Sequence, residues 1–283
     1  MMHIFMINGS GVPELIPGIL AEAFHVQVSE TDVSESSEWE ERNWDALVTC
    51  EYEPLDGDLR WSLSVYAAEG VQQQPEEQLA SLFAQRLTVP VFFAWNGPLP
   101  WIRQVALPDG GLTLARVVET KDGSTGFCVD AAESPVPGFP DVPVMRFPEV
   151  VRVLELPTPL TDAAVPPHAS EALARIRGLL AGWELLGLRM SSNWPPRGWY
   201  SAALYREDLD FREQLDAAVK ELPLSEREKV ESVLRELDSR YRDLTVDDQG
   251  RALSVGLTAE ESNFSGRPWY WHRRPLTLPW DQE

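Results

Sequence analysis

The sequence predicts an α+β protein: an N-terminal mixed sheet with helices on one face, followed by a small C-terminal helical domain. Up to about residue 130, alternating or continuous apolar segments typical of strands are interleaved with helical stripes. After residue 168 the apolar residues recur at helical spacing. The length of 283 residues is about twice that of a typical domain. We therefore expect an acidic α+β domain over 1–130, a connector over 131–167 and a helical domain over 168–283.

The first elements follow from local apolar patterning. Residues 3–7 predict a short strand, residues 13–24 a helix and residues 25–29 a second strand. Residues 30–41 are acidic and lack apolar periodicity, so we expect an acidic surface loop there.

Two hairpins are expected in the rest of the first half. Segments 47–53 and 61–67 both alternate, and the connection between them contains Asp56-Gly57, which predicts a hairpin. The remaining elements expected before residue 130 are a helix over 76–87, a central strand over 89–95 and a hairpin with arms over 101–107 and 112–118.

The segment 131–167 differs from the rest of the chain in composition, because it contains nine of the 23 prolines. Proline disfavours helix and favours extended or polyproline geometry. We expect a semi-rigid connector that wraps the first domain, in which residues 150–156 could add an edge strand.

Three amphipathic helices are expected in the second half. The first covers 170–187, with Ser170 as its N-cap. A second stripe over 211–222, which includes Phe211, ends at a proline. The sequence Ser-Glu-Arg-Glu at 225–228 predicts a capping box at the start of the third helix. Together these helices can close a small bundle.

Charge is the most informative bulk property. The chain has 45 acidic and 24 basic residues, a formal net charge of −21. Residues 1–150 hold 23 acids and 7 bases, net −16, whereas residues 151–283 hold 22 acids and 17 bases, net −5. Such a field repels nucleic-acid phosphates and anionic lipids and attracts cationic proteins. We therefore expect a cationic protein partner and no nucleic acid. No apolar segment is long enough to cross a bilayer, so no membrane association is expected either.

The two cysteines indicate a reducing compartment. Cys50 and Cys128 lie in separate strand-like runs, with no Cys-x-x-Cys spacing that would indicate zinc or a disulfide framework. The N-terminal apolar run lacks the basic region of a signal peptide. We expect reduced thiols and a cytoplasmic protein.

No constellation of residues predicts catalysis, a metal site or a cofactor. The turn at Asn8–Gly11 has the setting of a dinucleotide fingerprint, but position 14 is Glu, which would repel a pyrophosphate. The four histidines lie in unrelated contexts without a nearby nucleophile. The acids around Asp247 lack the spacing of a calcium loop. Binding is therefore favoured over catalysis.

The C-terminal segment 267–275 combines three aromatic rings, an imidazole and three guanidinium groups. Two uses suit it. The segment could bind a small anionic planar ligand between the two domains, by stacking and by bidentate hydrogen bonds. Alternatively, its aromatics cover the open face of the helical bundle while its arginines pair with the acidic first domain. The candidate ligand-binding residues are Trp269, Trp271, His272, Arg273 and Arg274.

Part of the chain resembles a known class of proteins. The strand at Trp61–Tyr66, the helix over 76–87, the strand over 89–95 and the turn at 108–111 resemble the α+β layout of bacterial immunity-type proteins encoded beside polymorphic toxins. This resemblance implies an antitoxin that presents carboxylates to a basic toxin surface, and it transfers no functional residue. The helical half, through Leu237–Tyr241, is similar to small bacterial modules from which no activity carries over.

Two functions of different classes follow. The first is a non-catalytic, acidic protein-binding module, of the immunity type or a structural, phage-associated component. Loop tryptophans suit such a module because a rigid indole covers much area at small entropic cost. The expected partner-binding residues are Glu35, Glu38, Trp39, Glu40, Glu41, Trp95 and Trp101. The alternative is an enzyme or sensor that uses the C-terminal aromatic and arginine residues.

Overall fold

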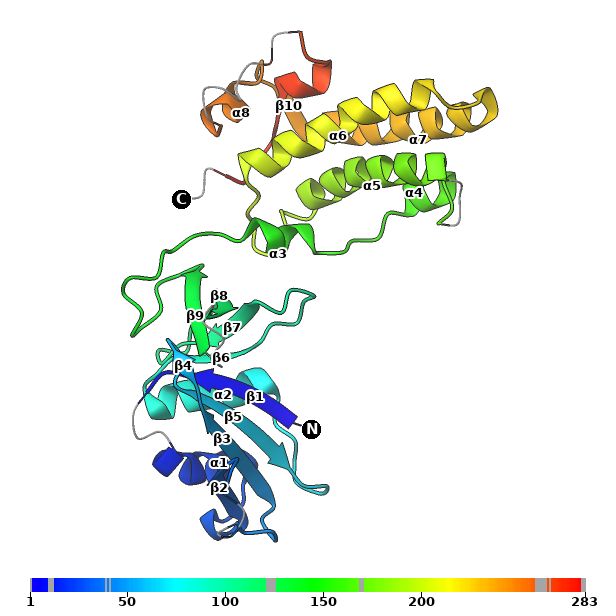
Figure 1. Cartoon of the computed structure of the whole chain (residues 1–283). Helices are drawn as coiled ribbons and strands as arrows, with labels where there is room; N and C mark the ends of the chain where they lie inside the picture. The colour runs from blue at the N-terminus through cyan, green and yellow to red at the C-terminus, as the bar shows by residue number, and fades with distance from the viewer. Residues whose placement is uncertain are drawn as a thin grey trace. The chain divides into compact units, whose positions relative to one another are not determined.

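The computed structural model describes residues 2–9, 13–38, 40, 42–120, 126–167, 171–257, 264 and 266–280. The chain divides into two compact units, Met1–Phe147 and Pro148–Glu283 (Figure 1). The first contains a nine-stranded mixed sheet, and the second contains most of the helices. The predicted α+β class is confirmed.

The strands of the first unit form one curled sheet. They are β1 (Met2–Ile7), β2 (Thr31–Glu35), β3 (Val48–Pro54), β4 (Asp56–Gly57), β5 (Trp61–Ala67), β6 (Val91–Ala94), β7 (Ile102–Ala106), β8 (Leu112–Glu119) and β9 (Gly126–Ala132). Their order is β2-β3-β5-β1-β6-β7-β8-β9-β4. Neighbours are antiparallel except for the pairs β2–β3 and β4–β9. Because β4 lies in the connection between β3 and β5 yet pairs with β9, the far edge of the sheet must curve back towards that connection.

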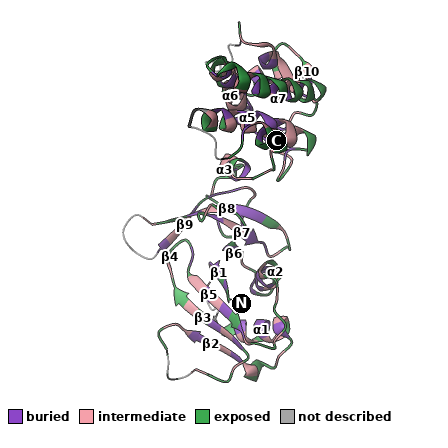
Figure 2. Ribbon diagram, turned by 90° about the vertical axis from the view of Figure 1, so that its right-hand side faces the viewer, coloured by how far each residue is buried: buried purple, intermediate pink, exposed green. Residues whose placement is uncertain are grey.

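Each face of this sheet has its own core, as strand alternation requires. Helices α1 (Ile16–Phe24) and α2 (Glu76–Leu87) pack on the face that carries Phe5, Leu63 and Val65. Short 3₁₀ turns precede and follow α1, at Pro13–Leu15 and Val28–Glu30. On the other face, Met6, Phe92 and Val105 are buried with Leu59, Val136 and Phe139. Several central strands therefore have consecutive buried residues, as in β6 and β8 (Figure 2).

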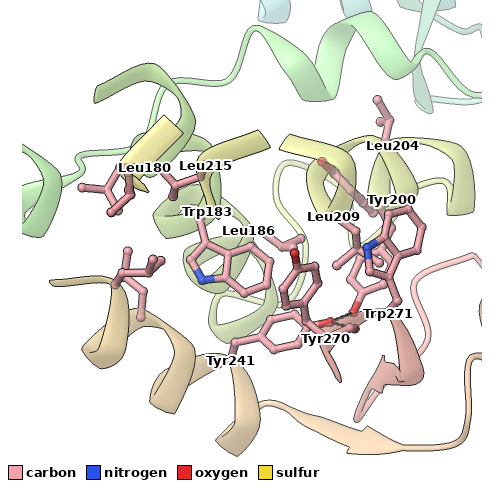
Figure 3. Close-up of a cluster of buried hydrophobic side chains, with 14 of the residues drawn as sticks. Leu180, Trp183, Leu186, Tyr200, Leu204, Leu209, Leu215, Tyr241, Tyr270 and Trp271 are labelled. Atoms are coloured by element: carbon pink, nitrogen blue, oxygen red, sulfur yellow. Dashed lines mark hydrogen bonds between the residues drawn. The ribbon is translucent and has the colours of Figure 1, made fainter. Parts of the chain in front are cut away.

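The second unit is a helical bundle closed by the C-terminal segment. Its elements are α3 (Pro148–Arg152), α4 (Pro159–Ala164), α5 (Glu171–Ser191), α6 (Ala202–Lys220), α7 (Leu224–Asp243), β10 (Thr245–Asp247), α8 (Arg251–Val255), the 3₁₀ turn η3 (Trp269–His272) and β11 (Arg273–Pro275). Strands β10 and β11 pair antiparallel. Figure 3 shows the aromatic and leucine side chains that fill the space between α5, α6, α7 and η3.

Most of the expected elements of the first half are confirmed, and two are wrong. Both hairpins, the helix over 76–87 and the central strand are present. The strand expected over 25–29 is absent: His25 adopts a left-handed conformation (φ 55°) that ends α1, and a 3₁₀ turn follows. The expected loop over 30–41 contains β2 instead. Parallel pairing with β3 supplies its backbone hydrogen bonds, and its polar sequence has no apolar alternation that would predict a strand.

Residues of the expected connector fold into both units. Residues 131–147 belong to the first unit and residues 148–167 to the second. The edge strand expected over 150–156 is wrong, because Pro148–Arg152 is helical. Proline is tolerated in the first turn of a helix, where its missing N–H has no intrahelical role.

The helices of the second unit are longer than expected. Helix α5 continues to Ser191, and its expected cap, Ser170, lies outside the described residues. Helix α6 starts at Ala202, where Ser201 Oγ accepts a hydrogen bond from the backbone of Leu204 (3.1 Å). Phe211, expected on its buried stripe, is 43% exposed. The capping box is also wrong: Pro223 is the N-cap residue of α7, without a side-chain cap, so 225–228 lies inside the helix.

Candidate functional site

Carboxylates concentrate in one part of the first unit. Residues 1–147 hold 22 acids and 7 bases, net −15, of which the 24 residues 30–53 contribute nine acids and one arginine, net −8. Strands β2 and β3, which pair in parallel, bring the two ends of this segment side by side. We define the acidic surface as the following described residues, each of which is at least partly exposed: Glu35, Glu38, Glu40, Trp44, Asp45, Glu51 and Glu53.

The loop between β2 and β3 is fastened over these strands. Arg42 Nη1 lies 2.6 Å from Glu51 Oε1, and Arg42 Nε donates to the carbonyl oxygen of Glu38 (2.9 Å). The backbone N–H of Asn43 donates to Asp32 Oδ1 (2.9 Å). The single arginine of the segment is therefore already neutralised by Glu51, and the acidic surface keeps its excess of carboxylates.

Trp44 is the most exposed aromatic side chain among the described residues, at 68%. It lies within the acidic surface, where the guanidinium of Arg42 is 5.7 Å from the centre of its ring. Sequence reasoning missed this residue, although its position between Asn43 and Asp45 in the most acidic segment was a usable signal. The expected Trp39 and Glu41 lie outside the described residues.

The electrostatic field of the acidic surface acts on a neighbouring phenol. Burial raises the pKa of Tyr52, and the carboxylates of Glu38 and Glu35 raise it further. Two of the expected partner-binding residues, Glu35 at the end of β2 and Glu38 in the loop that follows, thus both raise the pKa of Tyr52. Tyr52 also packs edge-on against Trp61, with ring centres 5.5 Å apart, which fixes its position.

The expected tryptophans Trp95 and Trp101 lie elsewhere on the sheet. Trp101 precedes β7 and is 43% exposed, and Trp95 follows β6 and is partly buried. Four strands separate β7 from β2, so these tryptophans do not join the acidic surface.

The C-terminal aromatic residues are part of the helical core. Tyr270 and Trp271 are each 1% exposed (Figure 3). The ring of Trp269 packs edge-on against Tyr241, with ring centres 5.9 Å apart. Tyr241 donates its hydroxyl to the carbonyl oxygen of Tyr270 (3.1 Å). These aromatics cover the open face of the bundle, as one of the two sequence interpretations expected.

The basic groups of this segment bind the backbone of their own unit. Arg273 Nε lies 2.8 Å from Thr245 Oγ1, and Nη2 donates to the carbonyl oxygens of Thr245 (2.7 Å) and Arg242 (3.1 Å). Arg274 Nη1 donates to the carbonyl oxygen of Pro275 (3.0 Å). His272 Nε2 lies 3.2 Å from the carbonyl oxygen of Arg267. These contacts differ from the expected pairing of both arginines with acids of the first domain.

A buried ionic network joins η3 to helices α6 and α7. Arg212, 3% exposed, contacts both carboxylate oxygens of Asp238 (3.0 and 3.2 Å) and Asp216 Oδ1 (2.5 Å). Trp183 Nε1 donates to Asp238 (3.0 Å), and the Tyr270 hydroxyl donates to Asp216 (3.1 Å). Every carboxylate in this network has a partner, so its role is structural.

Two hollows of the helical unit are lined by groups that already have partners. A cavity of about 280 Å³ lies between α5 and α7, where the carboxylate of Glu184 accepts the backbone N–H groups of Leu160 (3.0 Å) and Thr161 (2.8 Å). An acidic groove along α6 is occupied by Arg267, whose Nη1 lies 2.6 Å from Glu213 Oε2. The main charged groups of both hollows, Glu184 and Arg267, are therefore engaged within the unit.

Within the described ranges, no group of three or more His, Cys, Asp or Glu residues is placed to hold a metal ion. The described helices include none with the length and apolar character needed to cross a bilayer. No family model, curated protein or solved structure matches this chain.

Proposed function

We propose that the chain is a non-catalytic protein-binding module that masks a basic surface of a protein partner, in the manner of immunity-type antitoxins. The observation that supports this most is the acidic surface: residues 30–53 carry eight net negative charges, and the same segment contains the exposed Trp44. A cytoplasmic location is part of the proposal, and the two free cysteines support it.

The two components of the acidic surface have different physical roles. Exposed carboxylates attract a cationic partner over long range, so they raise the association rate and make binding salt-dependent. Trp44 supplies apolar contact area, and a buried tryptophan at an interface often contributes more than about 2 kcal/mol. Because Arg42 already pairs with Glu51, the partner must supply the positive charges that the remaining carboxylates attract.

The placement of groups suited to acid–base or nucleophilic chemistry supports a non-catalytic role. Cys50 is completely buried, and burial raises the pKa of its thiol, which keeps it protonated and unreactive. His3 is 5% exposed, with Nε2 3.1 Å from the carbonyl oxygen of Gln74. Among the described residues, these groups are engaged in packing and backbone contacts.

The experiment is capture of partners from the source cell by the tagged full chain at low and at moderate salt. Three variants are compared with the wild type: Trp44→Ala, the pair Glu38→Gln with Glu40→Gln, and the control pair Glu228→Gln with Glu231→Gln on the exposed side of α7. The control removes the same charge from the other unit. We expect a basic protein that the wild type and the control retain and that both acidic-surface variants lose.

The captured protein is then titrated against each variant. We expect affinity to fall about tenfold or more for Trp44→Ala, in line with an interface hot spot. Recovery of no protein at either salt concentration, or of one that binds all variants equally, would contradict the proposal.

A further inference from the structure

A second candidate site lies on the first unit, on the strands β7, β8 and β9. A cavity of about 340 Å³ is lined there by Trp101, Arg103, Val117, Glu119 and Phe127. The backbone N–H of Val117 donates to the carbonyl oxygen of Trp101 (2.8 Å), and Glu119 lies opposite Phe127 in the β8–β9 ladder. Three adjacent strands thus build the cavity, which makes it a rigid part of the sheet.

Arg103 is a partly buried cation. Its Nε is buried without a hydrogen-bond partner, and among the described residues no ion pair or hydrogen bond of the guanidinium is present. Its cross-strand neighbours are Ala94 on β6 and Ala115 on β8, which leave room but offer no side-chain acceptor. Burial lowers the pKa of Arg103, and the carboxylate of Glu76 opposes this only in part. Burying a charge in this way costs free energy unless an anion compensates it.

Other arginines of the same unit show how such groups are normally satisfied here. Arg116 Nη1 lies 3.0 Å from Asp130 Oδ2, and its guanidinium stacks over the ring of Phe147 at 4.9 Å. Arg86 makes a two-pronged contact with Glu22 (2.5 and 2.9 Å). Arg103 differs from both because, among the described residues, no carboxylate lies within ion-pair distance of its guanidinium, although Glu119 lines the same cavity.

We propose that this cavity binds a small planar ligand with a single negative charge, an aromatic carboxylate, with its carboxylate on Arg103 and its ring against Trp101 and Phe127. A guanidinium pairs with a carboxylate through two parallel hydrogen bonds, and the apolar walls suit a ring. The exposed carboxylate of Glu119 disfavours polyanions such as nucleotides. The residues that line this cavity are not those of the acidic surface, so the proposal does not rest on the proposed function.

The test uses phenylacetate as the probe, with the full chain observed by two-dimensional NMR. Phenylacetamide, the uncharged isostere, and inorganic phosphate, which lacks the ring, are titrated in parallel. We expect saturable shifts with phenylacetate and binding about tenfold or more weaker for phenylacetamide, because a charge-assisted hydrogen bond is lost. Equal binding of phenylacetamide would overturn the role of Arg103, and equal binding of phosphate would overturn the role of the ring.

Variants separate a binding role from a structural one. Arg103→Gln should lose phenylacetate binding while keeping or raising the thermal midpoint, because it removes an uncompensated buried charge. Trp101→Ala should weaken binding without changing the fold, since Trp101 is 43% exposed. The control Arg86→Gln removes the same charge from α2 and should bind as the wild type does. Unchanged affinity in Arg103→Gln, or a lowered thermal midpoint, would overturn the proposal.

Discussion

Arg42 and Glu51 close the loop between β2 and β3 with an ion pair of 2.6 Å, and the side chain of Arg42 is only 10% exposed. The two residues are nine positions apart, so their contact fixes the path of the intervening acidic segment. The same contact neutralises the single basic residue of the acidic segment 30–53. One interaction therefore shapes both the conformation and the charge of the proposed binding surface.

We expect Arg42→Ala to release this loop. Global stability should fall by only about 1 kcal/mol or less, because Glu51 is half exposed and partly screened by solvent. Local opening should increase, and protease cleavage within residues 36–46 should become faster. Limited proteolysis with mass spectrometry measures this. The matched variant Arg86→Ala breaks an exposed pair with Glu22 and should leave cleavage of the loop unchanged; equal cleavage in the two variants would refute the fastening role of Arg42.

Arg212→Met should destabilise the helical unit strongly. The variant leaves Asp238 and Asp216 without their cation in a largely buried site, and breaking such a network costs about 3–5 kcal/mol. Urea unfolding followed by tryptophan fluorescence measures the loss, since Trp183 donates to Asp238 in this network. The control Arg240→Met breaks an exposed pair with Glu236 and should cost about 0.5 kcal/mol or less. Similar losses in both variants would contradict the network.

Asp208 makes the helical unit sensitive to pH. Its pKa is raised to about 7: burial is the main cause and Glu207 adds to it, while the hydrogen bond from Tyr200 and the charges of Arg189 and Arg152 lower the pKa in part. The Tyr200 hydroxyl donates to Asp208 Oδ2 at 2.5 Å. Because the folded state holds this proton more tightly than the unfolded chain, its contribution to stability is present at low pH and is lost as the pH rises from about 4 to 7.

Asp208→Asn should remove that dependence. Asparagine keeps an acceptor for the Tyr200 hydroxyl and carries no charge, so the variant should gain stability over the wild type progressively from about pH 4 to pH 7, by up to about 4 kcal/mol. The difference in urea-unfolding free energy between the two proteins at pH 4, 6 and 8 measures this, because protonation of the other carboxylates cancels in the comparison. A difference that does not change with pH would contradict a raised pKa at Asp208.

The sequence predicts well the elements that local patterning dictates. Trp61, Leu63 and Val65 alternate on β5, and the stripe on α2 is visible in Leu79 and Phe83. Strand β2 has one aliphatic residue, Val33, and exists because β3 pairs with it. The Asp56-Gly57 turn also forms β4, which depends on a partner about 70 residues away. Strands β2 and β4 both depend on pairing with a strand that is distant in the sequence, and a short stretch of sequence does not contain that information.

The candidate sites divide in the same way. The acidic charge of residues 30–53 is readable from composition, and Glu38 and Glu40 are exposed, whereas Glu35 lies in β2 and not in the expected loop. The exposure of Trp44 required the fold of the loop. Arg103 carried no signal at all, because its missing partner becomes evident only when β6 and β8 place alanines beside it. A missing hydrogen-bond partner leaves no mark in the sequence, so such residues are found only from the structure.

Gly57 links the closure of the sheet to the cavity at Arg103. It adopts a left-handed conformation (φ 87°), and a Cβ added there would lie 2.5 Å from the carbonyl oxygen of Phe127, which lines the cavity. Gly57→Ala should therefore displace β9 as well as strain the backbone, and we expect a loss of about 2 kcal/mol or more in unfolding free energy.

The control for this variant is Gly70→Ala, since Gly70 has a similar left-handed backbone (φ 98°) but an added Cβ would meet nothing within 4 Å. Gly70→Ala should lower the unfolding free energy by about 1–2 kcal/mol, the cost of placing an alanine in a left-handed conformation without any steric clash. Phenylacetate titration then separates the two: affinity should fall in Gly57→Ala, because Phe127 moves, and stay unchanged in Gly70→Ala. Equal stability losses with unchanged phenylacetate affinity would mean that β4 does not position the wall of the cavity.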